Sequence, residues 1–160
     1  AVTCMDVNNS DSSFCSGHKT GDIRIFSMST LERTHHITSH HSSPITSINF
    51  TADMGRIVTT STDGVIKVFE TRMQKTLHTF EIAELSVPTM CSSVGLSKDD
   101  KFMAIGGKSG GLFMVELDTQ QVVEIFRDRH STPILGVAWD PNHGSRVASI
   151  DTLGSLLIWE

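Results

Sequence analysis

The chain has 160 residues, a length that suits one domain of ordinary size. Apolar residues make up 38% and charged residues 19%, and no apolar run approaches the ~18 residues of a spanning helix, so we expect neither a disordered chain nor a membrane-bound one. The net charge of −5 argues against nucleic acid as the main partner, because proteins that neutralise several phosphates normally carry a basic face.

Taken in chain order, short apolar runs separated by polar turns predict an all-β protein, with no helical periodicity of useful length. The turns contain residues that favour turn dihedrals, such as Asn8-Asn9-Ser10-Asp11 and Ser97-Lys98-Asp99-Asp100. The predicted strands are 2–7, 14–16, 21–27, 34–37, 45–50, 57–60, 64–70, 76–80, 90–96, 102–105, 110–116, 122–126, 134–139, 147–150 and 154–160.

A glycine precedes four of these strands, at Gly21, Gly64, Gly110 and Gly154, and the glycines lie 43, 46 and 44 residues apart. A period of about 40–45 residues with four strands per repeat is typical of a propeller blade. The strands after the glycines are apolar on both faces, which indicates blades packed face to face. A two-sheet sandwich is the alternative, but it does not require the period.

The predicted fold is therefore all-β: four-stranded antiparallel β-propeller blades in a partial propeller of about four blades. We expect a single segment over 1–160, with repeats at 1–39, 40–82, 83–129 and 130–160. The last repeat lacks a fourth strand, so we expect the remaining blades of the same propeller to be partners of this segment.

These repeats resemble the WD40 repeat family, and the resemblance covers essentially the whole chain. The second repeat has His41 before its first strand, Asp63 in its tight turn and Phe69-Glu70 where the family has Trp-Asp. The fourth repeat has His130 and ends in Trp159-Glu160, but it lacks the turn Asp. The third repeat has neither the His nor the Asp, so we expect it to rely on packing.

The resemblance implies a hydrogen-bonded chain that runs from the Trp indole through a strand hydroxyl and the His to the Asp. In the second repeat Phe69 has no N–H, so we expect the network to contain only His41, Ser61 and Asp63.

In the fourth repeat the same resemblance predicts that Trp159 and His130 are retained. Asp151 stands at the position assigned to the hydroxyl, so we expect its carboxylate to pair directly with His130.

Three groups of residues have a composition that also occurs at reactive sites, and we assign none of them a reaction. Ser61, His41 and Asp63 have the composition of a nucleophilic triad, but such a triad is recognised by geometry, and mutual pairing in a blade accounts for the three residues.

The histidines at 35, 36, 40 and 41 would suit zinc only if four ligands converged, and 106–111 has the letters of a phosphate loop without its spacing or its helix. We expect no catalytic residues, cofactor or metal. The three cysteines, without CxxC spacing, suit reduced thiols inside the cell.

The resemblance also implies that protein partners dock on the inter-blade loops and tight turns. Candidate contact residues on that rim are Lys19, His40, Lys108, Arg127 and Arg129. Their charge suggests acidic peptide or protein surfaces as partners.

The predicted function is a non-catalytic protein-interaction scaffold, intracellular and cytoplasmic, with the cytoskeleton or the nucleus as other locations. Two alternatives stay open: a segment of a large cytoskeletal or ciliary WD-repeat protein, and a propeller enzyme. Propeller enzymes gather carboxylates or metal ligands near the central channel, and no carboxylate recurs at first-strand positions, where only Asp6 is found.

Overall fold

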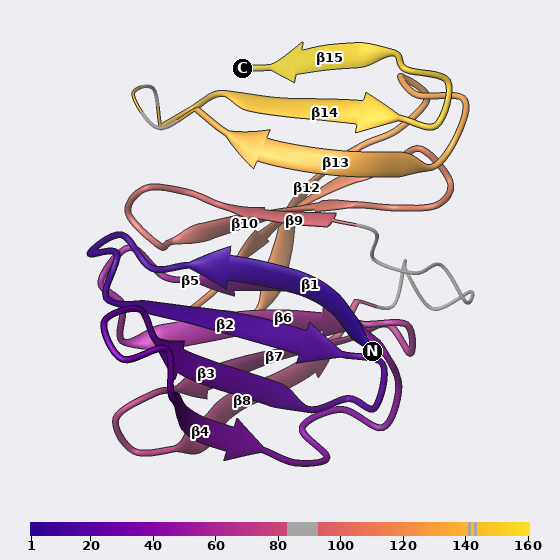
Figure 1. Ribbon diagram of the computed structural model, residues 1–160. Helices are drawn as coiled ribbons and strands as arrows, with labels where there is room; N and C mark the ends of the chain where they lie inside the picture. The colour runs from indigo at the N-terminus through magenta and orange to yellow at the C-terminus, as the bar shows by residue number, and fades with distance from the viewer. Residues whose placement is uncertain (83–92, 141, 143) are drawn as a thin grey trace. The chain divides into compact units, whose positions relative to one another are not determined.

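The computed structural model describes residues 1–82, 93–140, 142 and 144–160, and these residues form an all-β fold of antiparallel sheets (Figure 1). They divide into two compact units, Ala1–Glu81 and Ile82–Glu160, each with two sheets. The described residues contain no helix with the length and hydropathy that crossing a bilayer requires.

The first unit consists of two four-stranded meanders, in the orders β1-β2-β3-β4 and β5-β6-β7-β8. Every neighbouring pair is antiparallel. The strands are β1 (Val2–Val7), β2 (Ser13–His18), β3 (Ile23–Ser27), β4 (Arg33–Ile37), β5 (Ile45–Phe50), β6 (Arg56–Ser61), β7 (Val65–Glu70) and β8 (Lys75–Glu81).

The second unit contains a four-stranded meander, β12-β11-β10-β9, and a sheet that has three strands within the described residues, β13-β14-β15. The predicted strand at 90–96 is described from Ser93 onward, and its earlier part, with Cys91, lies outside the described residues. The strands are β9 (Ser93–Leu96), β10 (Phe102–Gly106), β11 (Leu112–Glu116), β12 (Gln121–Phe126), β13 (Ile134–Trp139), β14 (Val147–Asp151) and β15 (Leu156–Trp159).

Within each unit the two sheets, which we call blades 1 to 4 in chain order, pack through an isoleucine of one blade and a glycine of the other. A Cβ placed on Gly17 would lie 2.7 Å from the Ile45 side chain, and one on Gly106 would lie 2.5 Å from that of Ile134. Only glycine leaves room for this contact. Apolar residues around each contact form the core of its unit.

The aligned turn glycines hold the loop that leads into the next blade. Gly21 has φ of 80° and Gly110 has φ of 82°, a region that L side chains rarely occupy. A Cβ on these residues would lie 2.0 Å from the carbonyl oxygen of His41 and 2.3 Å from that of His130. The backbone N–H of His41 also donates to the carbonyl of Gly21 (3.0 Å). The turns at Gly21 and Gly110 therefore pack against the loop before the next first strand.

Replacing Gly110 with Ala is expected to destabilise the chain more than replacing Gly154, although Gly154 has nearly the same φ of 81°. No atom lies within 4 Å of a Cβ at Gly154, so its substitution carries only the left-handed backbone cost of about 1–2 kcal/mol. Gly110→Ala adds the clash with the His130 carbonyl, about 1–3 kcal/mol more. Urea unfolding of both variants measures the difference, and equal losses would contradict this account of the turn.

Candidate functional site

A continuous chain of hydrogen bonds crosses blade 4, partly buried at Trp159 and buried at His130. The Trp159 indole N–H donates to the Ser149 hydroxyl (2.8 Å), and that hydroxyl lies 2.7 Å from Nε2 of His130. Nδ1 of His130 lies 3.0 Å from the Asp151 carboxylate, so the two side chains pair directly. The carboxylate also accepts two backbone N–H groups of the following turn. The hydroxyl is supplied by Ser149, a residue that the sequence analysis did not select.

Burial and hydrogen bonding act in opposite directions on the Asp151 carboxyl, which is 2% exposed. Burial raises its pKa, but donation from the Ser155 and Leu153 amides and from His130 outweighs burial and leaves the pKa below its usual value. The group is therefore held as a carboxylate by the turn and the histidine together.

Blade 2 has the same arrangement around Thr59, with different donors. Nε2 of His41 lies 2.8 Å from the Thr59 hydroxyl, as Nε2 of His130 does from Ser149. Phe69 has no N–H to offer, and Nε2 of His40 lies 3.1 Å from the hydroxyl in place of an indole. The His40 ring packs edge-on against Phe69, with 5.7 Å between ring centroids. His40 thus replaces the missing indole donor.

The predicted chain His41–Ser61–Asp63 does not form. Among the described residues, Nδ1 of His41 and the Ser61 hydroxyl are buried without a hydrogen-bond partner. Asp63 instead accepts the Ser42 hydroxyl (3.1 Å) and the backbone N–H of Val65 (3.0 Å) in the turn. The physical reason is the length of the side chain. Ser61 stands three residues before the aligned glycine of its repeat, and Asp151 has the same position in blade 4. The longer Asp151 side chain reaches its histidine, whereas the Ser61 hydroxyl has no partner.

A hydroxyl five residues before the aligned glycine is the signal that the sequence analysis missed. It occurs as Ser16, Thr59 and Ser149, while the third repeat has the buried Ile105 there. In blade 1 the Ser16 hydroxyl lies 3.0 Å from Nε2 of His18, so this blade forms its own pair. Aligning on this position would have identified all three hydroxyls.

His40 was predicted to contact partners, and the structure contradicts that assignment. Its side chain is 4% exposed, and its carbonyl accepts a hydrogen bond from the Lys67 ammonium. Burial, then the charges of His41 and Lys67, lower the pKa of His40 to about 3. Burial, then Lys67, lowers the pKa of His41 to about 4. Both imidazoles are therefore neutral near pH 7.

The four predicted cations of the rim are exposed. Lys19 lies in the β2–β3 turn of the first unit. In the second unit, Lys108 lies in the β10–β11 turn, and Arg127 and Arg129 lie in the β12–β13 loop. That turn and that loop touch, because the Ile134 N–H donates to the Gly107 carbonyl (3.1 Å).

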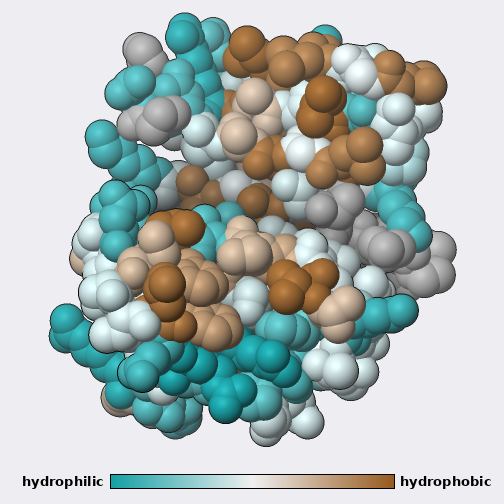
Figure 2. Space-filling model, in the orientation of Figure 1, coloured by the Kyte–Doolittle hydropathy of each residue, from teal (hydrophilic) through white to brown (hydrophobic). Residues whose placement is uncertain are grey.

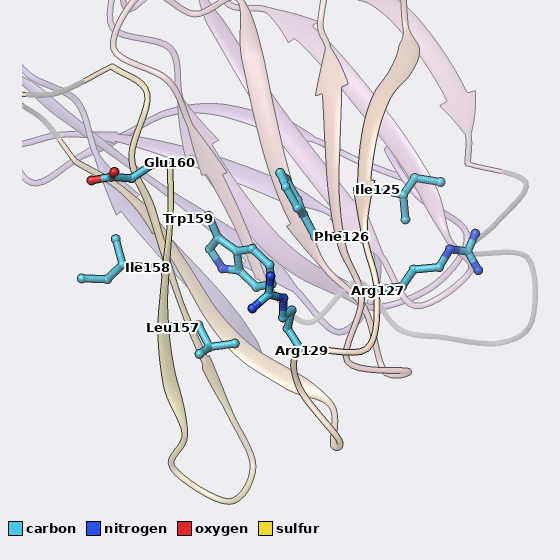
Figure 3. Close-up of a pocket in the computed structure, with 8 residues that line it drawn as sticks. All are labelled: Ile125, Phe126, Arg127, Arg129, Leu157, Ile158, Trp159 and Glu160. Atoms are coloured by element: carbon cyan, nitrogen blue, oxygen red, sulfur yellow. The ribbon is translucent and has the colours of Figure 1, made fainter.

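The two arginines line a pocket with a volume of about 390 Å³ between the end of β12 and strand β15 (Figure 3). Its apolar floor includes Phe126 and Trp159, whose ring centroids are 4.9 Å apart. Figure 3 shows Arg129 beside the face of β15 that carries Leu157 and Trp159, with Arg127 pointing away from the indole. No ion pair or hydrogen bond of either guanidinium is found among the described residues, so both charges are available to a ligand.

The described residues contain no cluster of three or more His, Cys, Asp or Glu side chains arranged to hold a metal ion. The arginine pocket combines a concave shape, aromatic surface and two of the predicted contact cations.

Residues 31–70 match the family model described as "WD domain, G-beta repeat". The match confirms the predicted resemblance to WD40 repeats, and it spans β4 to β7 with the Thr59 network.

The chain is also similar to longer proteins. It is 29% identical over 144 residues to "Autophagy-related protein 16" of Arabidopsis thaliana, covering 90% of this chain and 28% of that protein. It is 24% identical over 164 residues to "Protein tipD" of Dictyostelium discoideum, covering 99% and 27%. "Autophagy-related protein 18" of Kluyveromyces lactis is 30% identical over 105 residues, covering 65% and 20%. The chain thus spans about a quarter of the length of the first two relatives.

Ser149→Ala is expected to destabilise the chain by about 1–3 kcal/mol, because it leaves the Trp159 N–H and Nε2 of His130 buried without a partner. Ser61→Ala serves as the matched control: its hydroxyl is equally buried but has no partner, so the expected loss is below about 1 kcal/mol. Denaturant unfolding measures both values, and a larger loss at Ser61 would refute the assignment of the hydroxyl.

Stability is expected to fall as the pH drops below 6.5, because the unfolded chain then protonates His40 and His41 while the folded chain does not. The expected loss is about 2 kcal/mol for each histidine at pH 5. The free energy of unfolding, measured from pH 7.5 to 5, tests this prediction. The variant His41→Gln should lose the part of the pH dependence that His41 contributes.

Proposed function

We propose that this chain is a non-catalytic protein-interaction scaffold that binds acidic segments of partner proteins through the arginine pocket. The observation that carries the proposal is a pocket lined by two exposed arginines, neither with an ion pair among the described residues, in which Arg129 lies beside the aromatic surface of Phe126 and Trp159 (Figure 3). Arginine and exposed aromatic residues are enriched where proteins recognise other proteins. A carboxylate can take both hydrogen bonds of a guanidinium fork, which favours an acidic ligand.

The histidines and the first-strand carboxylate that could take part in catalysis are occupied by hydrogen bonds within the blades, which supports a role without catalysis. His40, His41 and His130 are buried, and each lies within hydrogen-bond distance of a blade hydroxyl. Asp6, the first-strand carboxylate that a propeller enzyme would use, accepts the backbone N–H of Phe50 (2.7 Å). These groups hold the blades together, which leaves the exposed loops for recognition.

The names of two relatives favour a place in autophagy for this scaffold. Both the plant and the yeast protein are called autophagy-related, so we place this role ahead of the cytoskeletal or ciliary one. The scaffold would then act inside the cell, in the cytoplasm. The remainder of a longer protein, including further blades, would join this segment as part of the same assembly.

Reversing both charges of the pocket, in the variant Arg127→Glu with Arg129→Glu, is expected to abolish capture of acidic partners by the chain. Arg33→Glu is the matched control, since Arg33 is also exposed but lies on β4 in the first unit. Affinity purification with quantitative mass spectrometry compares the three proteins. A set of partners that survives the double reversal would contradict the proposal.

A further inference from the structure

Another pocket, with a volume of about 540 Å³, lies between blades 1 and 2 of the first unit, and we call it the interblade pocket. Both blades have all four strands, β1–β4 and β5–β8. Blade 1 supplies Thr20, which comes before β3, and Ser39, which follows β4. Figure 2 shows hydrophilic residues gathered over the region where Figure 1 places β3 and β4. The pocket therefore belongs to a polar part of the first unit.

His41 lines the interblade pocket and has a buried ring nitrogen without a partner. The side chain is 2% exposed, and Nδ1 forms no hydrogen bond within the described residues. Nε2 lies 2.8 Å from the Thr59 hydroxyl, which donates its own proton to the Lys67 carbonyl (3.4 Å). Nε2 therefore carries the ring N–H and donates to Thr59, which leaves Nδ1 as an acceptor. A buried acceptor without a donor is unfavourable, so a ligand that supplies an N–H there is stabilised.

Two carboxylates line the same pocket. Asp63 accepts the Ser42 hydroxyl and the Val65 N–H, and these two bonds leave further lone pairs on its oxygens. Burial and Lys67 lower the pKa of His41, and Asp63 acts in the opposite direction, so its charge reaches the imidazole. The Glu81 carboxylate, at the exposed end of β8, forms no ion pair or hydrogen bond with another described residue. Both carboxylates can therefore accept from a ligand.

Lys67 also lines the interblade pocket, but its ammonium group does not supply the missing donor. That group donates to the carbonyl of His40, and it forms no ion pair with Asp63 or Glu81 in the described part of the chain. The lining therefore has two carboxylates and one ammonium beside the neutral ring of His41. This balance favours a ligand with a positive charge.

The arrangement of these acceptors fits a guanidinium better than an ammonium. They come from three places: His41 from the β4–β5 loop, Asp63 from the β6–β7 turn and Glu81 from the end of β8. A guanidinium has five N–H donors in a fixed plane, so two can bind one carboxylate while a third reaches a separate acceptor. An ammonium has all its donors on one atom.

We propose that the interblade pocket binds a guanidinium group, which donates to Nδ1 of His41 and to the carboxylates of Asp63 and Glu81. The group belongs to an arginine residue of another polypeptide or to a small guanidine compound, and the chemistry of recognition is the same for both. The inference goes beyond the proposed function, because it uses no residue of the second unit and its ligand has the opposite charge.

The test uses the 160-residue chain with isotope-labelled histidine, titrated with acetyl-arginine methylamide and followed by the NMR signal of Nδ1 of His41. The arginine probe is expected to shift this signal, because the free lone pair accepts a hydrogen bond. The citrulline analogue, whose urea group is neutral, and the lysine analogue are expected to bind about tenfold more weakly. Equal binding of either analogue, or an Nδ1 signal that the arginine probe does not shift, would overturn the proposal.

Ethylguanidine distinguishes the two sources of the group. Weaker binding of ethylguanidine than of the arginine probe would support the guanidinium site and assign it to an arginine residue, because the peptide groups then contribute. Binding as tight or tighter would support the same site and assign it to a small guanidine compound.

Glu81→Gln is expected to weaken binding of the arginine probe about tenfold, because it removes one of the two carboxylates. Glu81 is exposed, so the change leaves the packing of blade 2 intact. Glu70→Gln is the matched control, since Glu70 lies on β7 of the same blade but does not line the pocket. Equal weakening by both variants would overturn the site, because net charge alone would then account for the affinity.

The Nδ1 signal of His41 in the chain without probe excludes the other occupants. An N–H signal there would overturn the proposal, because the ring would then be a donor to Asp63. A signal that is already hydrogen-bonded and does not respond to the arginine probe would overturn it in favour of a bound water. Arg127→Glu with Arg129→Glu should leave binding of the probe unchanged, so failure of this inference is distinguishable from failure of the proposed function.

Discussion

The contact between a first-strand isoleucine and a second-strand glycine is the constraint on which the rest of the structure depends. Ile45 fits against Gly17 and Ile134 against Gly106, and in both cases a single added carbon would overlap the isoleucine. Burial of an isoleucine side chain in this contact contributes on the order of 1.5–3 kcal/mol. The contact also sets the distance between the two sheets of a unit. That distance in turn determines how closely Gly21 and Gly110 approach the carbonyl groups of His41 and His130. The loops that carry Arg127 and Arg129 leave the blade from a backbone fixed in this way.

A second level of organisation is the hydroxyl at the centre of three blades. Each of these hydroxyls lies among polar groups that would otherwise be buried without a partner, a situation that costs about 1–3 kcal/mol. Blade 4 uses an indole and an imidazole around Ser149, blade 2 uses two imidazoles around Thr59, and blade 1 uses one imidazole. Blade 3 replaces the hydroxyl with the buried Ile105 and needs no donor. The position of the central hydroxyl is therefore kept in three blades, while the residues that surround it differ. This accounts for the differences in sequence among the repeats at these positions.

Most of the strand pattern could be predicted from the sequence because it depends on local rules. Apolar alternation and turn residues placed the ends of the described strands within about two residues, the uncertainty expected of strand boundaries. The polar networks could not be read in the same way. Ser61 and Asp63 are adjacent to the turn and were grouped by residue type, whereas the partner of His41 is Thr59. The burial of His40 depends on Phe69, which lies 29 positions further along the chain and lacks an N–H, and no local pattern links these two residues.

The indole of Trp159 has a consequence for the order of protons in blade 4. An indole N–H can only donate, so the Ser149 hydroxyl accepts from it and directs its own proton to Nε2 of His130. The single imidazole N–H then belongs on Nδ1, where it donates to the Asp151 carboxylate. In blade 2 no indole sets this direction, and the Thr59 hydroxyl donates its proton to the Lys67 carbonyl (3.4 Å). With its proton used there, the Thr59 oxygen accepts from Nε2 of both His40 and His41. The same hydroxyl position is thus a donor to histidine in blade 4 and an acceptor from histidine in blade 2, and the difference follows from the indole that only blade 4 has.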